Sequence, residues 1–490
     1  MKKALKIAIV LGLVMVAVLA ASVGFAAKKT VPNYVGSQAC LGCHSDRWSS
    51  WAGSGHANMI LPVKTTADIP GWDKATAEQQ TELLKADFVV AGARFLARDS
   101  ATGNLVFLKY EWVAADQQWI DYDAPGQVWQ DSCMGCHTTS NTKAGVKDPK
   151  VEFGIGCESC HGPGKDHILG KGDPSKITLN VSSDVCGQCH NSGYKMTDNR
   201  WITGYLPNMK LTDVSGIVMA KVDPTKTANR GHHKEYPEWL VSGHGPKAVE
   251  DLKANSHASG TCYACHTQEA YAAKEEGGTF TYDANAEYVG ISCVTCHRPH
   301  GLGLAADEKE LCISCHTGSI DKATGLKPGS TAHHPMKEFF EGYGAAGGIT
   351  SNGNVHKDVT CQECHMANNN HLMAIVKPGD PNIADGSDDS CTVCHKNSDR
   401  EVRASYLDMW QEYTSGKLTT LNADVAAIDA AVKAGATLTA DQKLKLDTVK
   451  TNISFVTADG SEGAHNFDYA AKILSAATKD LAAIKAAVVK

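Results

Sequence analysis

Nine copies of one short pattern, Cys-x-x-Cys-His, constrain this chain more than any other feature. All 18 cysteines belong to these copies and none is left over: Cys40/Cys43, Cys133/Cys136, Cys157/Cys160, Cys186/Cys189, Cys262/Cys265, Cys293/Cys296, Cys312/Cys315, Cys361/Cys364 and Cys391/Cys394. The histidines that follow are His44, His137, His161, His190, His266, His297, His316, His365 and His395. Only 21 of the 490 residues are histidine, so composition alone does not produce this arrangement.

The spacing has a chemical reason. Two thioether bonds to the vinyl groups of one haem need sulfurs about one turn of chain apart, and the adjacent histidine then lies beneath the iron as its proximal ligand. Disulfide frameworks place no histidine after every second cysteine. Zinc sites built from Cys-x-x-Cys units need pairs of such units or separate histidines. The pattern therefore predicts nine covalently attached c-type haems.

Twelve further histidines are available, and nine haems need at most nine distal ligands. An imidazole is the usual second ligand in low-potential cytochromes. Within the adjacent pairs His232/His233 and His333/His334 we expect at most one histidine to bind iron. Met59, Met366 and Met373 stay open as alternatives that would raise a potential. The distal candidates are His56, His167, His233, His244, His257, His300, His334, His356, His371 and His465.

The first 26 residues have the layout of a secretory signal peptide, with lysines, an apolar run from Ile7 to Ala21, and small residues before a cleavage point after Ala26. An uncleaved membrane anchor is the alternative, and it would be the chain's one membrane contact. Removal of this segment changes the formal charge from −7 to −10. An acidic mature surface argues against nucleic acid as a partner and favours basic redox proteins. We expect an exported protein, periplasmic or extracellular, and the sequence leaves its oligomeric state open.

Hydrophobic residues make up only 42% of the chain, a thin supply for a core of this length, and porphyrins would fill the remainder. Short segments between Gly, Pro, Asn and Asp show little periodicity. We expect a mainly α fold with little regular structure around stacked haems. One small β-hairpin insertion is predicted at about residues 88–122, where Val106, Leu108, Tyr110 and Trp112 alternate with other residues.

The chain from about residue 401 has no cysteine and shows apolar residues at helical spacing, which predicts a C-terminal helical bundle. The stripes start at Val402, Leu418 and Leu446, and a fourth helix is expected from about Phe467 to Val488. Thr439 and Gln442 form a capping box before the third stripe. The predicted domains are a signal peptide at 1–26, a four-haem domain at 27–255, a five-haem domain at 256–400 and the helices at 401–490.

Two parts of the sequence resemble known families. The segment from Tyr34 to His56, the predicted hairpin and the run Gly156 to Gly164 resemble the tetrahaem cytochrome of the hydroxylamine-oxidation pathway. From Cys262 onward the order of His334-Pro335, His356, His371 and the helices around His465 resembles pentahaem cytochrome c nitrite reductase, hydroxylamine oxidoreductase and octahaem reductases.

The second resemblance implies that the haem of Cys262 and Cys265 takes the place of the catalytic haem, with His334 as the catalytic histidine. The chain departs from pentahaem nitrite reductases, which have lysine where His266 stands. It also lacks the tyrosine expected just after His316, and we find no arginine clearly placed after His297.

Two functions follow from these features. The first is an electron carrier of anaerobic respiration, in which mostly bis-histidine haems pass electrons to redox partner proteins or to an extracellular acceptor. The second is a reductase or oxidoreductase acting on nitrite, hydroxylamine or a sulfur oxyanion at the haem of Cys262 and Cys265. We assign no catalytic residue, and we expect the carrier. Polymerisation into a conductive filament is a third role that the sequence does not test.

Overall fold

The computed structural model describes residues 33–139, 152–179, 181–191, 205–214, 222, 233–275, 277–301, 303–381 and 389–488. The predicted signal peptide and His232 lie outside these residues. The chain divides into two compact units, one of Met1–Ala220 with Arg298–Gly303 and the other of Lys221–His297 with Leu304–Lys490. No described helix is long and apolar enough to cross a membrane.

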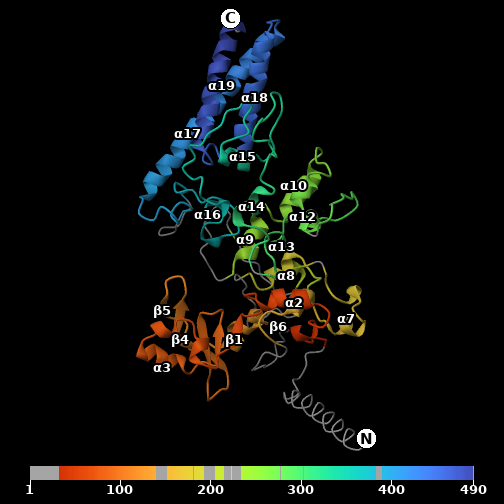
Figure 1. Cartoon of the computed structure of the whole chain (residues 1–490), viewed down its shortest axis with the longest axis vertical. Coiled ribbons are helices and arrows are strands. Elements are labelled where there is room, and N and C mark those ends of the chain that lie inside the picture. The colour runs from red at the N-terminus through yellow and green to blue at the C-terminus, as the bar shows by residue number, and fades with distance from the viewer. Residues whose placement is uncertain are drawn as a thin grey trace, which may run out of the picture. The chain divides into compact units, whose positions relative to one another are not determined.

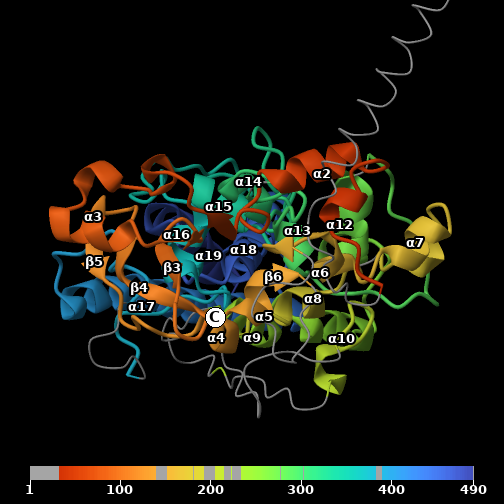
Figure 2. The ribbon, with the colours of Figure 1, turned by 90° about the horizontal axis from the view of Figure 1, so that it is seen from below.

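The first unit contains a five-stranded antiparallel sheet in which every strand pairs with the next one in sequence (Figure 1). Its strands are β1 (Ile60–Pro62), β2 (Phe88–Val90), β3 (Arg94–Arg98), β4 (Leu105–Val113) and β5 (Gln118–Asp121). In β4, Phe107 packs with Trp129 on one face, while Leu108 packs with Phe95 on the other. The helix α3 (Ala77–Leu83) covers part of this sheet (Figure 2). Apolar residues on both faces thus give the sheet its own core.

Short helices make up the rest of the first unit, with a two-stranded ribbon of β6 (Thr138–Thr139) and β7 (Glu152–Phe153). The helices are α2 (Ser45–Ala52), α4 (Trp129–Ser132), α5 (Met134–His137), α6 (Cys157–His161), α7 (Lys165–Leu169) and α8 (Ser183–Gly187). None of these exceeds eight residues, because glycine, proline and asparagine interrupt the intervening chain.

Short helices also hold most cysteine motifs of the second unit, while the ninth motif lies in a turn at residues 391–395. The helices are α9 (Glu235–Val241), α10 (Pro246–Ala254), α11 (Tyr263–His266), α12 (Gln268–Glu275), α13 (Cys293–Cys296), α14 (Glu308–Ile313), α15 (Met336–Glu341) and α16 (Cys361–His365). Single 3₁₀ turns occur in both units at Ser37–Ala39, Thr66–Asp68, Trp72–Lys74, Pro174–Lys176, Leu211–Asp213 and Ala367–Asn369.

Three long helices complete the second unit: α17 (Arg400–Lys433), α18 (Ala440–Asp459) and α19 (Phe467–Val488) (Figure 1). Leu421, Val449 and Ile473 meet between them, and Phe455 and Phe339 connect this core to α15. The capping box of Thr439 and Gln442 is confirmed at the start of α18.

The first two predicted apolar stripes lie on one continuous helix, α17, because a single glycine costs only about 1 kcal/mol in a helix and does not end it. The stripe that begins at Val402 was expected to pack, and this expectation was wrong for its first three residues, although Tyr413 packs against the core. Val402, Tyr406 and Met409 are 47%, 57% and 49% exposed.

The fold class is confirmed: the chain is mainly helical with short elements, one small antiparallel sheet and a C-terminal helical region. The predicted hairpin at 88–122 is the larger part of the sheet, and β1 was missed because three residues carry too little alternation to be recognised. The predicted domain limits stay a prediction.

Candidate functional site

Each Cys-x-x-Cys-His copy forms a tight turn, which belongs to a short helix in most copies and lies outside any helix at residues 40–44 and 391–395. The backbone N–H of the histidine donates to the carbonyl of the first cysteine, at 2.9 Å for His44 and Cys40 and at 2.8 Å for His297 and Cys293. The turn brings both thiols and the imidazole to one side of the chain. All 18 cysteines lie in the described ranges, and none of them forms a disulfide bond there.

Several copies contact one another through their cysteines. In the first unit the sulfur of Cys40 lies close to that of Cys157, and the sulfur of Cys136 lies close to that of Cys189. The second unit contains an equivalent contact between Cys312 and Cys361. Copies far apart in sequence are thus adjacent in space.

Histidine rings face one another in pairs throughout the first unit. His44 faces His167 with ring centroids 6.2 Å apart. His190 faces His56 at 6.2 Å, and His161 faces His300 at 5.8 Å with nearly parallel rings.

The second unit repeats this arrangement, with centroid separations from 5.8 to 6.3 Å. Each pair joins the histidine of one cysteine motif with a histidine from elsewhere in the chain. The pairs are His244/His316, His266/His334, His297/His371, His356/His395 and His365/His465.

This separation fits an iron between the two rings. A metal–imidazole bond is about 2 Å long, so two imidazoles on opposite sides of one iron have centres roughly 6 Å apart. Two stacked rings in direct contact would lie closer together, as His333 and His334 do at 4.0 Å. The residues therefore fit c-type haems with two histidine ligands.

The other ring nitrogen of several paired histidines has a hydrogen-bond acceptor. Nδ1 of His161 lies 2.6 Å from the carbonyl of Thr178, and Nδ1 of His167 lies 2.8 Å from the carbonyl of Asp173. Nδ1 carries the proton in such a bond, which leaves the Nε2 lone pair for a metal. Further Nδ1 contacts join His371 with the carbonyl of Asn369, His365 with the carbonyl of Met373, and His465 with the carboxylate of Asp459.

Burial keeps several of these imidazoles neutral. Burial, followed by the charges of His244 and His334, lowers the pKa of His316 to about 4. Burial also lowers the pKa of His300 and of His356. A neutral imidazole is the form that binds a metal, so the protein environment favours ligation at these positions.

A group of three histidines surrounds the fifth motif. Ligand atoms of His266, His333 and His334 all lie within 4.8 Å of one another. His334 has a φ of 49°, a left-handed backbone conformation that a side chain other than glycine adopts seldom and that is enriched at functional sites. Both members of the adjacent histidine pair thus remain candidates for the distal side of this motif.

The remaining predicted distal ligands are His233 and His257, and the second motif contributes His137. The ring of His137 packs edge-on against Trp129 with ring centroids 5.5 Å apart. His233 lies 3.8 Å from the carboxylate of Glu235. His257 is exposed, and no ring faces it within the described residues. The sulfur of Met373 contacts Nδ1 of His244, which is itself a distal candidate.

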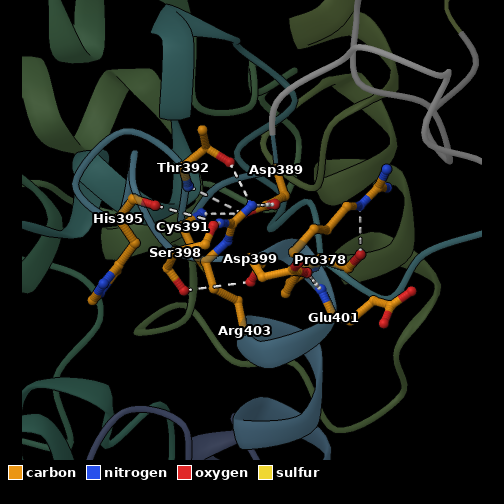
Figure 3. Close-up of polar contacts among 10 residues, drawn as sticks. Pro378, Asp389, Cys391, Thr392, His395, Ser398, Asp399, Glu401 and Arg403 are labelled. Atoms are coloured by element: carbon orange, nitrogen blue, oxygen red, sulfur yellow. Dashed lines mark hydrogen bonds and ion pairs between the residues drawn. The ribbon is translucent and has the colours of Figure 1, made fainter.

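The ninth motif is fixed by a buried ion pair that sequence reasoning missed (Figure 3). Asp389 Oδ1 accepts from the backbone N–H of Cys391 at 2.8 Å, and its Oδ2 accepts from Arg403 Nη2 at 2.6 Å. Arg403 also donates to the carbonyl of His395 at 3.3 Å and to the Thr392 hydroxyl at 3.1 Å. The pair therefore attaches the first turn of α17 to the motif that carries Cys391 and His395.

The electrostatics of this pair favour its charged form. Burial would raise the pKa of Asp389, but the Arg403 guanidinium and the Cys391 N–H lower it below its usual value. The Asp389 carboxylate raises the pKa of Arg403 in turn. The only signal in the sequence is an aspartate two positions before a cysteine, which by itself indicates nothing.

Three known families match parts of the chain. Residues 327–490 match the family described as Cytochrome c552. Residues 111–162 and 226–298 match the family Cytochrome c554 and c-prime, and residues 288–320 match a doubled CXXCH motif. These matches bear out the resemblance to multihaem cytochromes that the motifs indicated.

Solved structures and curated proteins are similar as well. The outer cell wall cytochrome OcwA is 30% identical, with a TM-score of 0.75 over 92% of this chain and 100% of that one. An undecaheme cytochrome from the S-layer of Carboxydothermus ferrireducens shares the fold, at 23% identity and a TM-score of 0.64 over 92% of this chain and 70% of that one. The multiheme cytochrome MtrA of Shewanella baltica (strain OS185) is 25% identical over 212 residues, 38% of this chain, which spans about half (52%) of that relative's length.

Proposed function

Because the chain belongs to the multihaem c-type cytochromes, we propose that it is an electron carrier with nine haems, most of them held between two histidines, that works outside the cytoplasm. The observation that carries this proposal is the set of facing histidine pairs at 5.8 to 6.3 Å. Haem supplies a reversible one-electron couple when it is bound. The polypeptide supplies the ligands, their burial and their order.

The order of the motifs supports transfer in series within each unit. In the second unit Cys296 of the sixth motif lies near Cys315 of the seventh. Cys312 then lies close to Cys361, and Cys364 lies near Cys394. Neighbouring motifs bring their cofactors into proximity, which is what a carrier needs.

The first unit has a comparable arrangement. Cys40 contacts Cys157, Cys160 interacts with Cys189, and Cys189 contacts Cys136. The motifs are therefore connected in the order first, third, fourth and second. A carrier of this kind uses no substrate pocket, and its distal positions are closed by histidine.

The partners of such a carrier are redox proteins or an extracellular acceptor. Support comes from the relatives, since OcwA is described as a protein of the outer cell wall and the undecaheme cytochrome as one of the S-layer. We propose export by the same reasoning, together with the signal-like segment at residues 1–26.

The experiment that tests the carrier is spectroscopy of the ferric protein. Two histidine ligands make the iron low-spin, so electron paramagnetic resonance should show a low-spin signal from every haem that two histidines hold. Added nitrite, hydroxylamine or cyanide should leave these signals unchanged. A substantial high-spin signal that responds to the ligands would overturn the proposal.

The second candidate is an enzyme acting at the fifth motif, and the cluster of His266, His333 and His334 favours it. Two histidines compete for one distal position there, so one of them is available beside the iron as a proton donor. In this case the high-spin signal that responds to added ligands would disappear in a variant that lacks Cys262 and Cys265. It would persist in variants of the other eight motifs.

A further inference from the structure

One paired histidine has an environment unlike that of the others. His465 precedes α19 and faces His365 of the eighth motif, with ring centroids 6.0 Å apart. Its Nδ1 lies 2.7 Å from Oδ1 of Asp459, the last residue of α18. The side chain of Asp459 is 0% exposed.

Asp459 has no lysine or arginine partner in the described part of the chain. Its other hydrogen bonds come from the backbone N–H of Ser461 at 3.3 Å and from the Ser461 hydroxyl. A buried carboxylate is costly unless a positive charge faces it. The facing group here is the N–H of His465, whose ring an iron on the other side would make more positive.

The remaining Nδ1 contacts of paired histidines are of another kind. His161, His167 and His371 donate to backbone carbonyls, at 2.6, 2.8 and 3.1 Å. Among these described contacts only His465 meets a carboxylate. A hydrogen bond to an ionised acceptor is roughly twice as strong as one to a neutral acceptor.

Such a bond changes the ligand as well as its orientation. A carboxylate that accepts from Nδ1 pulls the proton toward itself, which makes Nε2 a stronger electron donor. A stronger donor stabilises ferric iron more than ferrous iron. The loop holds this geometry through the left-handed Gly460, with a φ of 72°, and through Asn354, which donates to the carbonyl of His465 at 3.0 Å.

We propose that Asp459 is a positioning residue that orients His465 and lowers the reduction potential of the haem at Cys361 and Cys364. The inference rests on the proposed function. When this haem takes up one electron, the Nδ1 proton stays in the hydrogen bond, so no proton needs to enter the buried site. The eighth motif would then be the position along the series where ferric iron is favoured most by its ligand.

The test is a potentiometric titration of the intact holoprotein, followed by electron paramagnetic resonance, on the wild type and on Asp459→Asn. The asparagine amide has nearly the shape of the Asp459 carboxylate, but its oxygen is a weaker hydrogen-bond acceptor for Nδ1 of His465. In the variant we expect the ferrous-to-ferric ratio of one haem at a fixed potential to rise on the order of tenfold. For a one-electron couple this corresponds to a reduction potential higher by about 59 mV. Asp459→Ser is a second neutral variant with the same expected direction.

The matched control is Asp468→Asn. This substitution removes the same charge nine positions further along the chain, at a carboxylate that accepts from Ser351 and Lys472 and not from His465. Its substitution should leave every potential in place. If Asp459→Asn and Asp468→Asn shift the titration equally, the proposal is overturned.

A second comparison separates tuning through the ligand from a distant charge effect. In the background His465→Met the hydrogen bond no longer exists, so adding Asp459→Asn should change the potential no further. A shift that persists in that background would overturn the proposal. A low-spin wild type with an unmoved potential contradicts this inference alone, whereas a high-spin wild-type signal at this haem contradicts the proposed function itself.

Discussion

Removal of Arg403 should destabilise the protein by several kcal/mol, because it leaves a carboxylate buried without its counter-charge. The side chains of Asp389 and Arg403 are 1% and 10% exposed, so neither recovers solvation by a small movement. In Arg403→Met, Asp389 keeps the N–H groups of Cys391 and Thr392 and the Thr392 hydroxyl, but it loses the guanidinium. Breaking a buried ion pair from one side costs about 3–5 kcal/mol.

The free energy of the interaction itself follows from a double-mutant cycle of Asp389→Asn, Arg403→Met and the double variant. We expect a coupling energy of about 2–3 kcal/mol. The control is the exposed pair of Asp429 and Lys450, whose side chains are 50% and 40% exposed, with an expected coupling of about 0.2–1 kcal/mol. Urea unfolding of the holoprotein followed by far-ultraviolet circular dichroism measures both. Equal coupling energies in the two cycles would refute the reasoning.

The same pair gives a prediction for pH. The pKa of Asp389 is lowered in the folded protein, so its stabilisation is present in full above the unfolded carboxyl value of about 3.9. It is lost as the pH falls through the lower folded value. The difference in unfolding free energy between wild type and Asp389→Asn should therefore be constant from pH 7 to 5 and shrink only below about pH 4. A difference that already shrinks between pH 7 and 5 would contradict this.

Three further pairs of substitutions test the fold and the ligands. Phe455→Ala should cost about 3–5 kcal/mol in urea unfolding, since Phe455 is fully buried between Phe339 and Tyr469, whereas Tyr406→Ala on the exposed stripe should cost less than about 0.5 kcal/mol. His167→Met should raise the potential of the haem at Cys40 and Cys43, while His257→Met should leave all potentials unchanged; equal shifts would show that His167 is no ligand. Gly342→Ala should destabilise more than Gly348→Ala, because both have positive φ but only at Gly342 would a Cβ collide with the carbonyl of Ser351.

Sequence reasoning identified the attachment sites because each one is complete within five consecutive residues. The histidine that faces each motif could not be assigned in the same way. His44 faces His167, and His161 faces His300, each across more than a hundred residues. No spacing rule connects residues so far apart, so the sequence yields candidates, and the fold decides which rings meet.

The helices could be predicted from local sequence, whereas their contacts and the residues that support the motifs depend on the fold. The stripe from Leu446 to Val456 was predicted correctly, because its apolar residues pack against α19. The prediction was wrong for the first three residues of the stripe from Val402, since periodicity shows that a helix has an apolar face but does not show what covers it. Asp459 and Arg403 act through contacts made by folding, and for this reason neither was found in advance.

The number of haems attached to each chain is the property on which the proposed function depends most directly. Iron and covalently bound haem should be quantified per polypeptide in the purified holoprotein, together with titration of its thiols. Nine irons, nine haems and no free thiol per chain are expected from the nine Cys-x-x-Cys-His copies. Titratable thiols, or zinc in place of iron, would contradict haem attachment at these motifs.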